Sequence, residues 1–81
     1  MATLRVLSVA GDRAVSWDKK GAETGDAEAQ AAVREAERIF EEERRRGATA
    51  FRLLPGRPAT RVDSFDPEAD QIIMVPRVQG G

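Results

Sequence analysis

The residues whose chemistry is easiest to recognise stand at the end of the sequence, where Gly80 and Gly81 close a segment that begins at Pro76. Glycine has no side chain and adopts almost any backbone angle, so this segment fits a narrow tunnel that a side chain would block. The carboxylate of Gly81 can attack the α-phosphate of ATP once an enzyme aligns the two groups, and the acyl-adenylate can then pass to a thiol, to sulfide or to an amine. We therefore expect this carboxylate to be the reactive group, although a Gly-Gly end taken alone is equally typical of a disordered terminus.

The rest of the sequence offers little with which to catalyse such a reaction. It contains no histidine and no cysteine, which removes the commonest general base, the commonest metal ligand and every thiol nucleophile. Catalysis would have to rest on carboxylates, lysines or hydroxyls. We therefore expect a carrier on which another enzyme acts, with no bound cofactor and no metal, and with ATP used by the activating enzyme.

Charge and hydropathy narrow the class of partner. The net charge is −1 with 33% charged residues, so no overall field draws the chain to nucleic acid or anionic lipid. The arginines at 44–46 suit the negative end of a helix dipole. The four carboxylates between Asp63 and Asp70 fit a solvated turn, since an EF-hand loop begun at Asp66 would lack its glycine and its glutamate. The sequence shows neither a transmembrane run nor a signal-peptide pattern, and we expect a cytoplasmic monomer.

Hydrophobic periodicity predicts one long helix among short strands. The stretch from Asp26 to Arg46 carries one apolar stripe, with Asp26 placed to cap its start and Gly47 to end it. The stripe consists of Ala29, Ala32, Val33, Ala36, Ile39 and Phe40. Strands are predicted at residues 4–10, 13–17, 48–54, 60–63 and 72–75, a loop at 18–25, and a turn at 65–70.

This order, β-β-α-β-(β)-β, predicts an α+β protein with a mixed sheet of four or five strands packed on one α-helix. The first and last strands lack clean alternation, as strands in the centre of a sheet do, so we expect them to lie side by side and parallel. The alternating strands would flank them, which is the arrangement of the β-grasp. A ferredoxin-like fold would need a second helix. We expect one domain over residues 1–76 and a flexible tail over 77–81.

The last twelve residues resemble the C-terminus of the ubiquitin-like sulfur carriers, which include the small subunit of molybdopterin synthase and the thiamine carrier. Those proteins end in an acidic turn, an apolar strand, a proline, a valine and Gly-Gly. The matching residues here are Asp70, Pro76, Val78, Gly80 and Gly81. The segment is also similar to the end of ubiquitin, which has an arginine in the place of Arg77. The chain departs from the sulfur carriers in its long, arginine-rich helix and in Gln79, where they carry a small residue.

The resemblance implies that an E1-like (ThiF/MoeB-type) enzyme adenylates Gly81 and recognises Arg77, Val78 and Gln79. Bacterial ubiquitin-like proteins encoded beside E1, E2 and deubiquitinase-like partners are similar in general shape. The preferred hypothesis is therefore a ubiquitin-like protein modifier, with an E2-like enzyme, a deubiquitinase-like (JAB) protease and a target protein as further partners. Two alternatives stay open: a sulfur carrier with a C-terminal thiocarboxylate for cofactor or thiolation biosynthesis, and a non-covalent interaction module.

Five further residues are candidates for contact with other molecules: Ile73, Val75, Lys19, Lys20 and Trp17. If Ile72 and Met74 face the helix, Ile73 and Val75 lie on the open face of the sheet, where ubiquitin-like domains commonly meet partners; the opposite register is nearly as good. The only side-chain amines available for self-linkage are those of Lys19 and Lys20. Trp17 is expected to pack in the core, although tryptophan is also frequent at binding hot spots.

Overall fold

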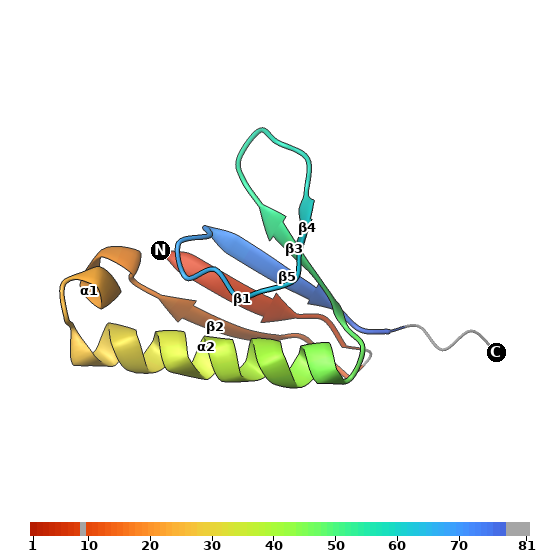
Figure 1. Ribbon diagram of the computed structural model, residues 1–81, viewed down its shortest axis with the longest axis horizontal. Helices are drawn as coiled ribbons and strands as arrows, with labels where there is room; N and C mark the ends of the chain where they lie inside the picture. The colour runs from red at the N-terminus through yellow and green to blue at the C-terminus, as the bar shows by residue number, and fades with distance from the viewer. Residues whose placement is uncertain (9, 78–81) are drawn as a thin grey trace.

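The computed structural model describes residues 1–8 and 10–77, which form a five-stranded mixed sheet with one long helix across one face (Figure 1). The strands are β1 (Ala2–Val6), β2 (Arg13–Trp17), β3 (Thr49–Leu53), β4 (Thr60–Val62) and β5 (Gln71–Val75), and the helices are α1 (Lys19–Glu23) and α2 (Ala27–Arg45). The prediction for the first strand ran too far along the chain. Ser8 begins a turn instead: its carbonyl accepts from the Gly11 amide at 3.2 Å, and its hydroxyl accepts from the Ala10 amide at 3.1 Å.

The strand order is β2-β1-β5-β3-β4, so the first and last strands of the sequence meet in the middle of the sheet. β1 and β5 run parallel, with Leu4 opposite Ile72 and Val6 opposite Met74, and the other three pairings are antiparallel. The predicted parallel central pair is therefore present. This mixed α+β arrangement is compatible with a β-grasp.

Strict alternation of burial in the two central strands fixes which face meets the helix. Leu4 and Val6 of β1 and Ile72 and Met74 of β5 are buried, and the residues between them are only half-buried. From α2, the stripe contributes Ala29, Ala36, Ile39 and Phe40 to the buried set. Complete burial of each large apolar side chain stabilises the fold by about 1.5–3 kcal/mol, so this layer supplies most of the favourable free energy of folding.

The capping predicted for α2 is wrong at its N-terminal end and confirmed at its C-terminal end. Asp26 occupies the N-cap position, but its side chain makes no capping hydrogen bond, so that predicted role is wrong. At the other end Gly47 adopts φ +94°, as predicted for the residue after a helix. Its amide donates to the Arg44 carbonyl and the Ala48 amide donates to the Glu43 carbonyl, both at 3.0 Å, which is the Schellman pattern.

The predicted loop at 18–25 is wrong over Lys19–Glu23, which forms the short helix α1. Asp18 caps it, because its carboxylate accepts from the Lys20 amide at 3.1 Å. Gly21 lets α1 approach α2 closely: a Cβ built on Gly21 would lie 3.3 Å from Cβ of Ala29. Five residues are too few for hydrophobic periodicity to show, and the glycine that signals a loop serves helix contact here.

The segment between β4 and β5 returns across the helix-facing side and is held by aromatic residues. Phe65 packs between Trp17 and Phe40, with ring centroids 5.7 and 5.8 Å away. The indole Nε1 of Trp17 donates to the carbonyl of Pro67 at 3.1 Å. Trp17 is 2% exposed, so its expected role in packing is confirmed.

Candidate functional site

The strand that leads to the predicted reactive segment is the central strand of the sheet. β5 has neighbours on both sides, β1 and β3. The parallel pairing with β1 extends one step further, because the Leu7 amide donates to the Met74 carbonyl at 3.0 Å. Strand pairing with β3 reaches Val75, which lies opposite Thr49. The chain therefore stays anchored in the middle of the sheet until its last few residues.

Pro76 ends the strand, as predicted, since proline has no amide hydrogen to donate to a ladder. Pro76 and Arg77 are both exposed. The other predicted site residues of this segment lie outside the described residues; they are Val78, Gln79, Gly80 and Gly81. Of the predicted recognition residues, the structure thus places Arg77 alone, at the surface.

The register of β5 settles the choice between the two sheet faces. Ile72 and Met74 are 0% exposed and face α2. Ile73 and Val75 therefore project from the opposite, open face, where both are half-buried. This is the orientation that would make Ile73 and Val75 available to a partner.

The structure adds two apolar residues to this face. Phe51 of β3 lies directly opposite Ile73, and Leu53 lies opposite Gln71. Both are half-buried, while Ala50, which lies opposite Met74, is fully buried in the core. The open-face patch, defined as Phe51, Leu53, Ile73 and Val75, is thus contributed by two adjacent strands.

Two arginines flank this patch along one row of the sheet. Arg5 of β1 lies beside Ile73 on one side, and Arg61 of β4 lies beside Phe51 on the other. Arg5 also pairs with Asp12, at 3.8 Å between Nη1 and Oδ2, with both side chains more than 40% exposed. An apolar centre with cationic edges favours a partner surface that is apolar with acidic edges. The sequence had pointed to Ile73 and Val75 but not to this row.

The two lysines predicted as acceptors have different surroundings. Lys19 donates from Nζ to the Asp70 carboxylate and, at 3.3 Å, to the Glu68 carbonyl. The hydrogen bond to Asp70 raises the pKa of Lys19 and lowers the pKa of Asp70, which keeps the amine protonated. Lys20 is exposed on α1. A protonated, hydrogen-bonded amine is a poorer nucleophile, so the geometry favours Lys20 over Lys19 as an acceptor.

The acidic stretch before β5 forms a turn in which the three aspartates have separate cations as partners. Asp63 pairs with Arg44 at 3.4 Å and Asp66 pairs with Arg52 at 3.2 Å. Asp70 is bound by Lys19, as described above. Asp66 also accepts from the Glu68 amide at 2.9 Å, which closes the turn locally. These side chains thus stabilise the turn through contacts with three different elements.

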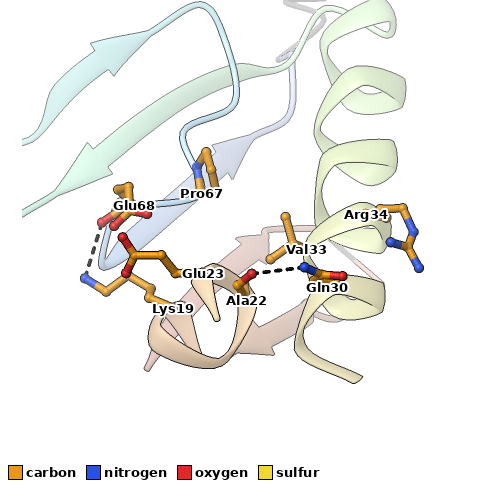
Figure 2. Close-up of a pocket in the computed structure, with 8 residues that line it drawn as sticks. All are labelled: Lys19, Ala22, Glu23, Gln30, Val33, Arg34, Pro67 and Glu68. Carbon is orange, nitrogen blue, oxygen red and sulfur yellow. Dashed lines mark hydrogen bonds between the residues drawn. The ribbon is translucent and has the colours of Figure 1, made fainter. Parts of the chain in front are cut away.

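A pocket of about 310 Å³ lies between α1, α2 and the turn before β5 (Figure 2). Figure 2 shows two hydrogen bonds across its edges, from Lys19 to the Glu68 carbonyl and from Gln30 to the Ala22 carbonyl at 3.2 Å. Val33 and Pro67 add apolar surface. Its lining comes from three separate stretches of sequence, so no local motif could have revealed it. The volume is at the lower end of the range for small-molecule sites.

Comparison with known proteins gives no relative that would assign a function to these residues. No family model, curated protein or solved structure matches the chain. Within residues 1–8 and 10–77, no helix combines the length and the apolarity needed to cross a membrane. Any chemistry proposed for the site is therefore inferred from the end of β5, from the open-face patch and from the sequence that follows Arg77.

Proposed function

We propose that the protein is a ubiquitin-like modifier with a β-grasp fold, whose Gly81 carboxylate is adenylated by an E1-like enzyme and transferred to a target. The observation that carries the proposal is the placement of β5. This strand lies in the centre of the sheet, parallel to β1, and continues through exposed Pro76 and Arg77 into the sequence that ends in Gly80-Gly81. The resemblance of the last twelve residues to ubiquitin-like C-termini supports the same assignment.

The proposed chemistry needs no catalytic side chain from this protein. A carboxylate oxygen of Gly81 attacks the α-phosphorus of ATP, a new P–O bond forms, and pyrophosphate leaves. An amine of the target then attacks the glycyl carbonyl carbon, and AMP leaves with the bonding electron pair. Where a thiol of a conjugating enzyme attacks first, AMP leaves in the same way, and the target amine then attacks the thioester carbonyl and expels the thiolate. The attacking group loses its proton to solvent or to a base on the partner. No acid or base on this chain is needed for these steps.

In this proposal the protein binds the activating enzyme through its sheet and presents its C-terminal segment to that enzyme. Ile73 and Val75 of the open-face patch lie on the same strand that leads to Arg77, so an enzyme docked on them is already next to the start of the reactive segment. The flanking arginines Arg5 and Arg61 restrict the orientation of docking. This arrangement favours recognition by the body of the domain together with chemistry at the terminus.

Expression of the N-terminally tagged full chain in its source cells tests the proposal. We expect slower-migrating conjugates that survive denaturing electrophoresis. The matched control has one alanine added after Gly81, which removes the Gly-Gly carboxylate and should abolish the conjugates. Conjugates that persist while the intact mass shows that the added alanine is retained would contradict the proposal. The intact mass of the unconjugated wild-type chain also has to show Gly81 as its terminal residue, whether encoded or exposed by processing.

The sulfur-carrier alternative is supported by the same terminal segment, in particular by Pro76 and Val78, and predicts a different product. The protein purified from its source would carry a terminal thiocarboxylate, with sulfur in place of one carboxylate oxygen, and would form no conjugates. Intact mass spectrometry separates these outcomes, because a thiocarboxylate without conjugates would replace the modifier assignment. If the alanine-extended chain keeps all partner binding and every cellular effect, the protein acts as a non-covalent module.

A further inference from the structure

Arg77, the last described residue, lies against the glycine that ends α2. The register of β3 with β5 sets Thr49 opposite Val75, so the residues that precede β3 pass next to the residues that follow β5. A Cβ built on Gly47 would lie 3.1 Å from Cδ of Arg77, 3.6 Å from its Cβ and 3.9 Å from its Cγ. The aliphatic stem of Arg77 therefore crosses over Gly47. We call this the Gly47–Arg77 contact.

Two separate requirements fall on Gly47. Its φ of +94° belongs to the Schellman pattern that closes α2 and strains any side chain, although asparagine adopts a positive φ more often than most residues do. The contact with Arg77 adds a second demand, because a Cβ at position 47 would lie 3.1 Å from Cδ and would displace the arginine stem by a few tenths of an ångström. Helix closure therefore strains any residue other than glycine, and the contact adds a displacement of the Arg77 stem to that strain.

Electrostatics favour the same arrangement. The last turn of α2 is the negative end of the helix dipole, where cations are stabilised. Nε of Arg77 is bonded directly to the Cδ that lies over Gly47, so the guanidinium starts next to this end of the helix. Arg77 as a residue is still exposed, which leaves its guanidinium accessible to a partner. Packing of the stem is thus combined with an accessible charge.

We propose that Gly47 is a positioning residue for the reactive segment: by holding the stem of Arg77, it fixes the point from which residues 78–81 continue. The biological meaning of this contact rests on the proposed function. Holding Arg77 in advance reduces the conformational entropy that an activating enzyme has to overcome when it binds the segment. Loss of the contact should therefore weaken productive binding more than it slows the chemical step.

Trypsin provides a probe that does not depend on the proposed function. It cleaves after an arginine only when that side chain enters its specificity pocket, so Arg77 has to leave Gly47 first. Gly47→Asn strains the backbone at φ +94° and in addition places a Cβ against the stem. We expect the initial rate of cleavage at the Arg77–Val78 bond, followed by intact mass, to rise roughly fivefold or more, since proteolysis tracks the population of the open form.

The chain offers a closely matched control. Gly25 also has φ +94°, and a Cβ built there would meet no atom within 4 Å. Gly25→Asn therefore makes the same backbone change without touching Arg77, and cleavage at the Arg77–Val78 bond should stay at the wild-type rate. Cleavage after Arg34, in the middle of α2, reports global unfolding. Equal rates in Gly47→Asn and Gly25→Asn, or an equal rise at Arg34 and Arg77, would overturn the proposal.

A functional measurement then separates this inference from the proposed function. In the conjugation assay with source-cell extract, Gly47→Asn should raise the protein concentration for half-maximal conjugation roughly tenfold, with a nearly unchanged maximal rate. Gly25→Asn should match the wild type. A fall in maximal rate without a change in half-maximal concentration would contradict a positioning role. If Gly47→Asn speeds cleavage at Arg77 but no chain forms conjugates, the Gly47–Arg77 contact is supported and the proposed function is wrong. If cleavage at Arg77 is unchanged in Gly47→Asn and the wild type forms conjugates, the proposed function is supported and the positioning role of Gly47 is wrong.

Discussion

Lys19 and Asp70 join α1 to the residue that immediately precedes β5. The pair spans 51 positions of sequence, so it closes a long-range contact next to the root of the central strand. The side chains are 31% and 46% exposed, which means that water and salt screen the attraction. We therefore expect a small effect on stability and a clear dependence on pH and ionic strength.

The pH dependence follows from the two shifts. The pKa of Asp70 is lowered from 3.8 by its hydrogen bond with Lys19, so its contribution is present above 3.8 and is lost as the pH falls through the lowered value. The pKa of Lys19 is raised from 10.5, so its contribution is present below 10.5 and is lost as the pH rises through the raised value. The pair stabilises the fold between these limits.

Asp70→Asn should lower the urea midpoint at pH 7, and the difference from the wild type should shrink below pH 3.8. Urea titrations at pH 7 and pH 3, each at low and at high salt, check this. A difference of the same size at pH 3 and pH 7 would show that Asp70 acts through its shape rather than through its charge.

Single residues also show where the sequence could and could not be interpreted. Gly47 was predicted to end the helix, because a glycine after an arginine-rich last turn is a strong local signal. Its contact with Arg77 has no local signal, since the two residues are brought together by strand register. Asp26 was predicted to cap α2, yet it is Asp18 that caps a helix with its side chain. Whether an N-cap side chain bonds the first turn of its helix depends on its rotamer and on nearby groups, and the sequence alone does not give their positions.

The alternation of β5 makes the strongest prediction at the scale of the elements. Ile72 is fully buried against the helix side, and its neighbour Ile73 is half-buried on the open face. Ile72→Ala should cost about 2–5 kcal/mol, because it leaves a cavity in a packed layer. Ile73→Ala should cost about 1 kcal/mol or less in the isolated protein, since only part of its surface is buried.

Thermal and urea unfolding of both variants measure these costs, and the conjugation assay measures function. Ile73→Ala should stay folded and conjugate less efficiently, whereas Ile72→Ala should lose conjugation only in proportion to its unfolding. If Ile73→Ala is folded and conjugates at the wild-type rate, the open-face patch has no part in docking.

The sheet could be predicted because apolar patterns distinguish central from flanking strands. The near-continuous apolar runs around Leu4 and Ile72 led to the parallel central pair. The contribution of β3 to the open-face patch could not be predicted from such patterns. In β3 the large residues Phe51 and Leu53 face away from the helix and the small Ala50 faces it, which reverses what side-chain size alone suggests. The pairing with β5 decides this orientation.

At the scale of the whole molecule, the sequence predicted one mixed sheet packed on one long helix, and the structure has this arrangement (Figure 1). It missed α1 and the pocket beneath it, because these depend on close approach at Gly21 and on residues from three segments. The proposed function joins the sheet to chemistry at Gly81, a position outside the described residues. The most direct test therefore examines Gly81 in the cell.

Trypsin cleaves after Arg77, so a lysine joined to Gly81 would keep Val78-Gln79-Gly80-Gly81 as a branched remnant. The decisive measurement is tandem mass spectrometry of trypsin-digested protein purified through the N-terminal tag from its source cells. The account predicts this remnant on lysines of target proteins, and on Lys20 in preference to Lys19 wherever the chain modifies itself. Abundant peptides from the chain together with no remnant on any amine, in cells where its activating enzyme is expressed, would contradict the account.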